Sequence, residues 1–344
     1  MKHILFSLFF LPFLAISQDT VKVNTIPNQD AEKLYNEGIS SYASRNYESA
    51  INSFSQAITM KPDFEKAWYN RGICKFEMRD FNGAIQDETK AIELNTKNDQ
   101  AYYYRAQAYY ALGKKTDAIN DYTQCITINS SHAQAYYYRG GIKFELTDYK
   151  GAVGDFDNAI MSKPDYAYAF NDRGSAKRML DDLDGAIVDY KKAIQLDAKL
   201  AFVHNNLGSV LRKKGDFKGA IDSYTTAIQI KPDAQTFNNR GSARYDNGDY
   251  NGAIKDFSEA IKMKYDYVFA YNNRAGAKIK LKDYKGAIND CDFVLKLNDK
   301  YGYAYLNRGI AKEMIRDKTA CDDWRKAADL GVESAKSYLG ECKK

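Results

Sequence analysis

A tripeptide made of glycine, alanine and a branched aliphatic residue recurs along this chain at an almost constant spacing. The alanines lie at positions 50, 84, 118, 152, 186, 220, 253 and 287, a step of 34 residues interrupted once by a step of 33. A second series of small residues keeps the same period: Gly38, Gly72, Ala106, Gly140, Gly174, Gly208, Gly241, Ala275 and Gly309. Such a period indicates a repeat protein, in which each unit buries its apolar face only against its neighbours.

The spacing of apolar residues inside one repeat is helical. We number the repeats so that position 1 is Ala31, Glu65, Asp99, Ala133, Ala167, Ala201, Ala234, Val268 and Gly302. Apolar residues at positions 20, 21, 24, 27 and 28 then share one helix face. Small residues at positions 8, 20 and 27 would let two helices approach closely, and large residues at positions 4, 17 and 24 would fill the remaining space. Proline at position 32, as in Pro62, Pro164 and Pro232, would end the second helix.

A helix–turn–helix repeat of this length and pattern resembles the tetratricopeptide repeat (TPR). The resemblance covers residues 31 to about 331. It implies an all-α fold: a right-handed superhelical solenoid of about nine helix–turn–helix TPR units plus a C-terminal capping helix. The first helix of each unit, helix A, would line the concave face. Glu88 and Cys291 depart from the family pattern, because position 24 is normally aromatic.

The expected organisation has four parts. We expect a signal peptide over residues 1–17, a short linker over 18–30, the TPR array over 31–331, and a capping helix with a tail over 332–344. The repeats are expected near residues 31–64, 65–98, 99–132, 133–166, 167–200, 201–233, 234–267, 268–301 and 302–331.

The first 17 residues indicate export. The run from Ile4 to Ile16 is apolar apart from Ser7, and small residues at Ala15 and Ser17 predict cleavage before the glutamine at position 18. A run of about 13 residues is too short to span a bilayer, and nothing amphipathic supports the alternative of a buried N-terminal helix. We therefore expect an exported protein, periplasmic or secreted, with no integral membrane segment after signal removal.

Arginine at position 7 and aspartate at position 23 are present together or absent together in the first eight repeats. The pairs are Arg71 with Asp87, Arg105 with Asp121, Arg139 with Asp155, Arg173 with Asp189, Arg240 with Asp256, and Arg274 with Asp290. Repeat 1 has Glu37 and Ser53 at these positions, and repeat 6 has Leu207 and Ser223. We infer a structural ion pair that joins the two helices of one repeat and specifies their register.

The five cysteines form no metal-binding cluster in the sequence. Cys342 lies on the expected capping helix, and Cys321 lies on the helix that it would cover. A Cys321–Cys342 disulfide is one interpretation and two free thiols are the other, with export making the bond possible. The other three, at positions 74, 125 and 291, occupy small packing positions and are expected to be buried thiols.

The sequence offers no enzymatic site. It lacks a recognisable catalytic triad context and a phosphate-binding glycine loop, so we expect no enzyme, no cofactor and no metal. The net charge of +5 arises from 50 basic and 45 acidic residues that alternate throughout the chain. Nucleic-acid-binding proteins concentrate basic residues on one face, so we expect no nucleic-acid partner.

The expected partner is a protein or peptide bound along the concave face. In the family that face includes positions 5 and 6, which here are tyrosine-rich in the first half and asparagine-rich in the second. An asparagine amide presents a donor beside an acceptor, which suits the backbone of an extended peptide, and tyrosine offers flat amphipathic area. The predicted partner-binding residues are Asn36, Asn70, Tyr103, Tyr104, Tyr137, Tyr138, Asn206, Asn239, Asn273 and Asn307.

Two alternatives stay open at this point. The asparagines can be ordinary surface residues, and the protein can be a self-associating structural component of the cell envelope. The carboxylate clamp of some family members is matched only by Lys66 and Asn70, which argues against recognition of a C-terminal carboxylate. The sequence does not set the oligomeric state.

Overall fold

The computed structural model describes residues 26–340 and residue 342. The predicted signal peptide and the first part of the predicted linker lie outside the described residues.

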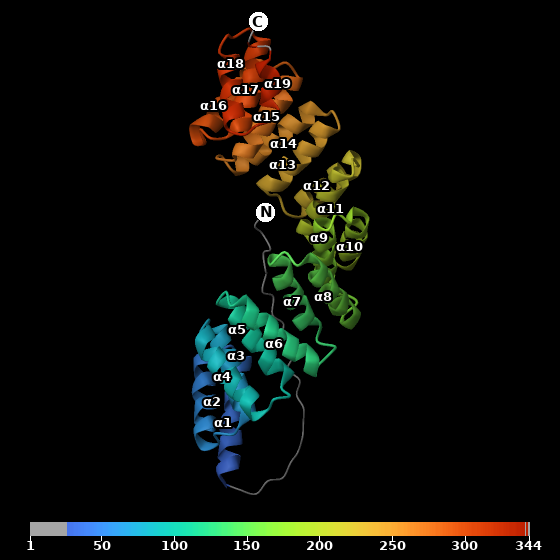
Figure 1. The fold of residues 1–344 in the computed structure, drawn as a ribbon. Helices are drawn as coiled ribbons and strands as arrows, with labels where there is room; N and C mark the ends of the chain where they lie inside the picture. Colours follow the sequence, from blue (N-terminus) through green and yellow to red (C-terminus); the bar gives the residue numbers. More distant parts are fainter. Residues whose placement is uncertain (1–25, 341, 343–344) are drawn as a thin grey trace. The chain divides into compact units, whose positions relative to one another are not determined.

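The described residues form nineteen α-helices and no strand, so the all-α fold is confirmed (Figure 1). Helices A are α1 (Ile26–Ala43), α3 (Glu65–Glu77), α5 (Asp99–Ala111), α7 (Ala133–Glu145), α9 (Ala167–Met179), α11 (Ala201–Lys213), α13 (Ala234–Asp246), α15 (Val268–Lys280) and α17 (Gly302–Met314). Helices B are α2 (Tyr47–Met60), α4 (Phe81–Leu94), α6 (Lys115–Ile128), α8 (Tyr149–Ser162), α10 (Leu183–Leu196), α12 (Phe217–Ile230), α14 (Tyr250–Met263), α16 (Tyr284–Leu297) and α18 (Ala320–Asp329). Helix α19 (Ala335–Leu339) follows them.

The described residues form two compact bodies, an N-terminal body that ends at residue 124 and a C-terminal body that begins at residue 125. In the N-terminal body α1 packs on α2, α2 on α3, α3 on α4, and α4 on α5. In the C-terminal body each helix from α7 to α18 packs on the next, and α19 packs on α18. Consecutive helices A also touch one another, from α7 to α17 in this body. Each body is thus a stack of helix hairpins.

The turn inside each hairpin explains the recurring glycine of the tripeptide. Asp148 precedes α8 and its carboxylate accepts a hydrogen bond from the Gly151 N–H at 2.9 Å, which caps the helix. A Cβ atom at Gly151 would overlap that carboxylate. The same cap forms between Asp182 and Gly185 and between Asp283 and Gly286. The glycine is therefore needed where the capping aspartate folds back on the helix.

Small residues at the helix crossings let rings fill the core. Gly208 lies against the Tyr224 ring, and a Cβ there would come within 2.8 Å of it. Gly140 lies against Phe156 in the same way. The alanines at positions 20 and 27 are fully or almost fully buried, as Ala220 shows. This is the small-against-large packing that the repeat pattern predicts.

Both ends of the array differ from expectation. Residues 26–30, predicted as linker, already belong to α1. The helix predicted over residues 332–342 is confined to Ala335–Leu339, because Gly331 adopts a φ of +85° that ends α18 and residues 332–334 form a turn. Among the described residues, no helix combines the length and the apolarity that a bilayer span requires.

Candidate partner-binding face

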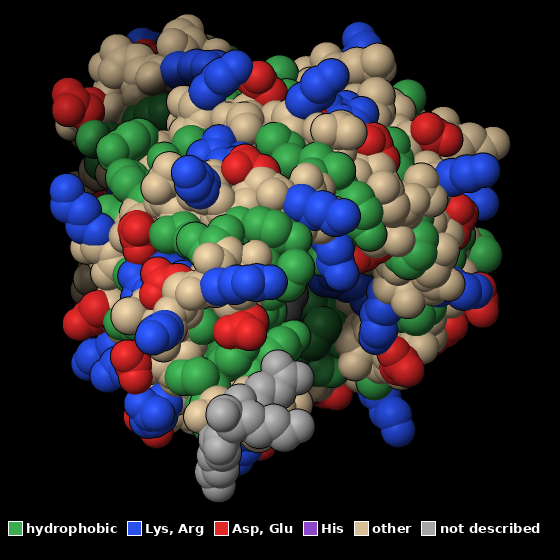
Figure 2. All heavy atoms as spheres, turned by 90° about the horizontal axis from the view of Figure 1, so that it is seen from above, with side chains coloured by type: hydrophobic (Ala, Val, Ile, Leu, Met, Phe, Trp, Pro, Cys, Tyr) green, Lys and Arg blue, Asp and Glu red, His purple; other side chains and the backbone are tan. Residues whose placement is uncertain are grey.

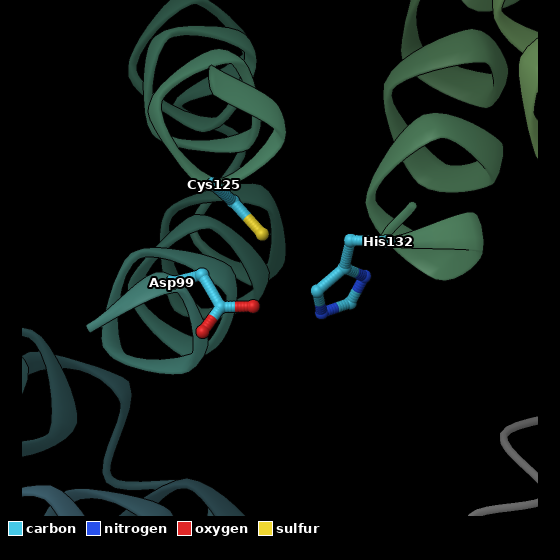
Figure 3. A group of neighbouring side chains, drawn as sticks. All are labelled: Asp99, Cys125 and His132. Carbon is cyan, nitrogen blue, oxygen red and sulfur yellow. The ribbon is translucent and has the colours of Figure 1, made fainter. Parts of the chain in front are cut away.

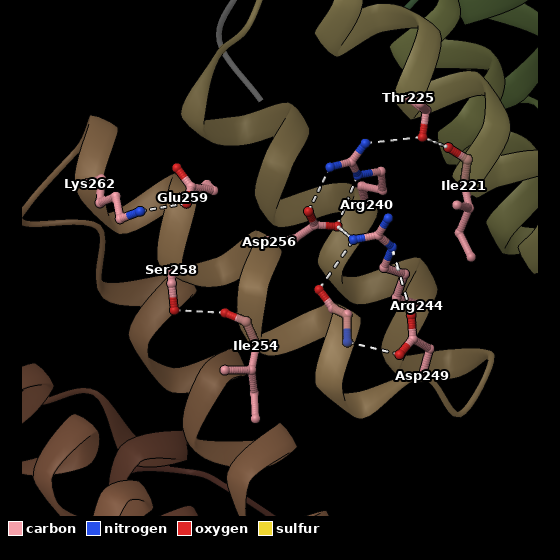
Figure 4. Close-up of polar contacts among 11 residues, drawn as sticks. Ile221, Thr225, Arg240, Arg244, Asp249, Ile254, Asp256, Ser258, Glu259 and Lys262 are labelled. Carbon is pink, nitrogen blue, oxygen red and sulfur yellow. Dashed lines mark hydrogen bonds and ion pairs between the residues drawn. The ribbon is translucent and has the colours of Figure 1, made fainter.

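The recurring Arg–Asp pairs join helix A to helix B in every repeat except repeats 1 and 6. In repeat 7, Arg240 donates through Nε and Nη2 to the two oxygens of Asp256 at 2.9 and 2.7 Å (Figure 4). Its Nη1 donates to Thr225 Oγ1, on helix B of the preceding repeat, at 3.1 Å. Arg244 adds a second cation 2.9 Å from the Asp256 carboxylate. We call this arrangement the Arg–Asp node.

The node recurs in the other repeats where the sequence predicts the pair, and the structure adds one in repeat 9. It joins Arg71 to Asp87, Arg105 to Asp121, Arg139 to Asp155, Arg173 to Asp189, Arg274 to Asp290, and, in repeat 9, Arg308 to Asp323. The hydrogen bond to Asp323 raises the pKa of Arg308. Each arginine also lies over the ring at position 4 of its repeat, as Arg71 does over Trp68 at 4.7 Å. These residues therefore belong to the framework of the repeats.

Sequence reasoning missed two parts of the node. The first is a second cation, at position 11, which pairs with the node aspartate of its own repeat. These cations are Lys75, Lys143, Lys177, Arg244, Lys278 and Lys312. The second is a side chain on helix B of the preceding repeat that accepts a hydrogen bond from the arginine Nη1. These acceptors are Ser55, Thr89, Asp157, Thr225, Ser258 and Asp292. The position-11 lysine was visible in the alignment of repeats. The acceptor on the preceding repeat can be serine, threonine or aspartate, so no single residue type marks it in the sequence.

The asparagines form a hydrogen-bonded ladder between repeats. Each amide at position 6 donates to the side chain at position 5 of the preceding repeat: Asn206 to Asn171, Asn239 to Asn205, Asn273 to Asn238, and Asn307 to Asn272, at 2.9–3.1 Å. In the N-terminal body Asn70 donates to the Tyr35 hydroxyl at 3.0 Å. The ladder therefore uses one N–H of each position-6 amide inside the protein. The Oδ1 atoms of Asn206, Asn239, Asn273 and Asn307 accept no hydrogen bond from the described residues.

Two predicted contact residues are in the wrong place. Tyr103 and Tyr137 are only 6% and 9% exposed. The Tyr103 ring packs 6.0 Å from Tyr122, and the Tyr137 ring packs 4.8 Å from Tyr166. The Tyr137 hydroxyl also donates to Asp172 of the next repeat. Both rings are buried, so they cannot offer open surface to a partner.

The remaining predicted residues keep part of their surface. Tyr104 and Tyr138 are half-buried, and Asn70 is half-buried as well. Asn36 is exposed and lines a shallow hollow along α1 with Glu32 and Lys33.

A row of exposed rings at position 2 escaped the sequence reasoning. Tyr168, Phe202, Phe269 and Tyr303 are 37%, 42%, 57% and 56% exposed. Each precedes the position-6 residue of its own helix by four residues, so the ring and the polar side chain share one helix side. Tyr168 and Phe202 stack at 5.8 Å between ring centroids. We call positions 2 and 6 of α9, α11, α13, α15 and α17 the helix-A face.

One member of this face is a carboxylic acid. Asp172, at position 6 of repeat 5, accepts hydrogen bonds from the Tyr137 hydroxyl at 2.8 Å and from Asn171 Nδ2 at 2.9 Å. Burial raises its pKa to about 6, although both hydrogen bonds act in the opposite direction. Asp172 thus takes the place that an asparagine has in the following repeats.

The two histidines that the structure describes serve the fold. His132 directly precedes α7 (Figure 3). It caps that helix, because its Nδ1 accepts a hydrogen bond from the Ala135 N–H at 3.1 Å. His204 is buried, and its Nε2 lies 3.2 Å from the Ala198 carbonyl oxygen. Basic and acidic side chains are interleaved over the surface seen in Figure 2, with apolar side chains between them.

The stacked hairpins of each body define a helical repeat protein. Tetratricopeptide repeat models match residues 100–132 and 201–233, and residues 35–99 and 238–292, while a TPR repeat model matches residues 178–215. These segments make up more than half of the chain. The protein belongs to the tetratricopeptide repeat family, and its fold implies protein–protein interaction.

Solved structures share this fold at low sequence identity. The C-terminal part of a TPR repeat-containing protein from Cytophaga hutchinsonii matches with a TM-score of 0.57 and 20% identity, covering 69% of this chain and 99% of that one. A TPR protein from Parabacteroides merdae matches with a TM-score of 0.52 and 21% identity over 72% of this chain and 98% of that one. PilF from Pseudomonas aeruginosa matches with a TM-score of 0.53 and 16% identity, over 60% and 94%. No curated protein matches the sequence significantly.

Proposed function

We propose that this protein is a non-enzymatic scaffold that binds an extended polypeptide along the helix-A face of its C-terminal body, outside the cytoplasm. The observation that carries the proposal is the row of exposed rings one helical turn from a row of amide oxygens. Peptide N–H groups can donate to the Oδ1 atoms of Asn206, Asn239 and Asn273. Apolar side chains of the peptide can pack on Phe202 and Phe269, which are 42% and 57% exposed.

The geometry suits a chain in extended conformation. Packed helices lie about 8–10 Å apart, and an extended chain advances about 3.3 Å per residue, so about three peptide residues pass each repeat. Recognition of backbone N–H groups is tolerant of sequence, whereas the rings select apolar side chains. The binding mode is therefore a moderately selective one.

The test is selection from a random library of displayed peptides of about twelve residues, long enough to pass four repeats. We expect the full chain to enrich peptides whose binding is lost in the triple variant Phe202→Ala, Phe269→Ala, Tyr303→Ala. The matched control replaces Met161 and Val188, which are 75% and 65% exposed on helices B, by alanine. The absence of any enriched peptide, or equal loss in the control, would refute binding at this face.

Export is the second part of the proposal. It is supported by the apolar N-terminal segment and by a disulfide between Cys321 and Cys342, since such bonds persist in oxidising compartments. Expression of the full chain in a bacterial host, followed by fractionation and mass spectrometry, should give a protein outside the cytoplasm that starts at residue 18. A full-length cytoplasmic product would contradict it.

A further inference from the structure

Arg178 is half-buried near the end of α9, and its side chain has no hydrogen-bond or ion-pair partner among the described residues. Its Nε is buried and donates no hydrogen bond within that part of the chain. It lies at position 12 of repeat 5, seven residues after Asn171 and so on the same side of the helix. The inference drawn from this residue rests on the function proposed above.

The contrast with the other arginines is the first argument. Every other half-buried arginine among the described residues donates to a carboxylate: Arg71, Arg105, Arg139, Arg173, Arg212, Arg240, Arg244, Arg274 and Arg308. Arg212 holds the same position in the next repeat and pairs with Asp246 at 2.6 Å. Leaving a guanidinium partly desolvated without an acceptor is unfavourable, and a ligand that supplies the acceptor would remove that cost.

Two pairs of hydroxyl groups, one in repeat 5 and one in repeat 6, lie near the guanidinium. Ser175 Oγ lies 3.1 Å from the Tyr190 hydroxyl, and the Tyr224 hydroxyl donates to Ser209 Oγ at 3.1 Å. Burial raises the pKa of Tyr190 and of Tyr224, and the positive charge of Arg178 opposes that shift in both. Arg178 therefore lies near both pairs. Ser175 and Ser209 already donate to the carbonyl oxygens of Asn171 and Asn205, so the guanidinium is the donor that is left for an anion.

Arg178 lies at a defined distance from an apolar contact. Tyr168 lies ten residues before Arg178 on α9, and its ring stacks on Phe202 of α11 at 5.8 Å. Ten helical residues span about 15 Å, a length that four or five residues of an extended peptide cover where the peptide follows α9 rather than crossing the repeats.

We propose that Arg178 binds the carboxylate of an aspartate or glutamate side chain in the partner peptide, while an apolar side chain four or five residues away packs on Tyr168 and Phe202. A guanidinium matches a carboxylate in plane and can donate two parallel hydrogen bonds to it. The partner of this face is thus an extended segment that combines an apolar and an acidic residue at this spacing.

The test compares peptides selected by the wild-type chain with peptides selected by Arg178→Gln. The peptides are fused to their carrier through the C-terminus, so that only side-chain carboxylates are available. We expect the wild type to enrich Asp or Glu four or five residues from an apolar residue, and Arg178→Gln to keep the apolar preference and lose the acidic one. Arg212→Gln, at the same position of the next repeat, is the matched control and should keep both.

The dissociation constants of two synthetic peptides test the inference quantitatively. One is an acidic peptide from the selected set, and its twin is the same peptide with the Glu→Gln change. The wild type should bind the acidic peptide about tenfold more tightly than the twin, and Arg178→Gln should bind both equally. Arg178→Gln should melt at or above the wild-type temperature, whereas a purely structural role for Arg178 predicts a lower one. Enriched peptides without an acidic preference refute this inference alone; no enriched peptide at all refutes the proposed function with it.

Discussion

Glu88 occupies a position where most repeats carry a ring. In repeat 2 it lies against Gly72, as Phe54 lies against Gly38 in repeat 1. Its side chain is fully buried, and neither carboxylate oxygen has a hydrogen-bond partner among the described residues. Burial raises its pKa well above the ordinary value of 4.5, and repulsion from Asp87 adds to the shift. Burial in the folded chain therefore favours the neutral form of Glu88.

Replacing Glu88 by phenylalanine should stabilise the protein. The ring would fill the crossing at Gly72 as Phe54 fills the one at Gly38, and it removes an unpaired polar group. We expect the free energy of unfolding to rise by about 1–3 kcal/mol at neutral pH, measured by urea denaturation. The reverse change, Phe54→Glu, should lower it. A lower stability in Glu88→Phe would show that the carboxylic acid has a partner in solution.

The same residue should impose a pH dependence. The unfolded chain ionises Glu88 near pH 4.5, whereas the folded chain retains the proton to a higher pH because the pKa is raised. The folded state then binds more protons, so this group's contribution to the free energy of unfolding falls as the pH rises above about 4.5. The difference in stability between Glu88→Gln and wild type should grow from pH 4 to pH 8. A constant difference would contradict a buried neutral acid.

The turns offer a second test with single residues. Position 15 has a positive φ in each repeat, at glycine in Gly113, Gly215 and Gly248 but at a β-branched residue in Thr147, with a φ of +64°. Side chains with a Cβ are unfavourable there. Thr147→Gly should raise the free energy of unfolding by about 1 kcal/mol, and Gly215→Thr should lower it by a similar amount, in thermal or urea melts. A change of the same sign in both variants would contradict this account.

At the scale of the helix pair, the Arg–Asp node joins three helices. The sequence predicted the intra-repeat pair because a buried charge without its partner is costly, so the two residues appear and disappear together. It could not predict the third contact, because serine, threonine and aspartate all accept from the arginine. Nor could it place Tyr103 and Tyr137, since a position-5 side chain packs inward whether it is tyrosine or asparagine. Asn238 is only 8% exposed, and its polarity is satisfied by the next repeat.

Repeat 6 shows how the node can be removed as a whole. It carries Leu207, Leu211 and Ser223 where repeat 8 carries Arg274, Lys278 and Asp290. We expect Asp290→Ala alone to lower the free energy of unfolding by about 3–5 kcal/mol, because two half-buried cations lose their carboxylate.

The triple replacement Arg274→Leu, Lys278→Leu, Asp290→Ser should cost far less than the single one, since no charge stays buried and unpaired. Arg325→Ala breaks an exposed pair with Asp322 and should change stability by less than about 1 kcal/mol. The measurement is the free energy of unfolding by urea denaturation, compared among the wild type, Asp290→Ala, the triple variant and Arg325→Ala. A triple variant as unstable as Asp290→Ala would mean that the node stabilises the fold through its charges.

At the scale of the whole molecule, a stack of hairpins needs a cover at its open end. Val332 and Ala335 are buried there beside Leu306 and Trp324, and the Tyr338 ring stacks on Trp324 at 5.0 Å. The sequence indicated a cap over this segment because its apolar residues keep helical spacing. The predicted helix was longer than α19. The sequence pattern does not show that Gly331 adopts a left-handed conformation, which ends α18 and leads into a turn before α19.

The Cys321–Cys342 disulfide ties this cap to the array across a separation of 21 residues. Closing a loop of that length stabilises a fold by about 3 kcal/mol through the entropy of the unfolded chain. Reduction of the wild type should therefore loosen α19 and expose Trp324, seen as faster amide exchange in α18 and α19 with little change in the hairpins before them. Cys321→Ser, Cys342→Ser should show the same exchange with or without reductant. Identical exchange of the wild type in both conditions would show that packing of Val332, Ala335 and Tyr338 alone holds the cap.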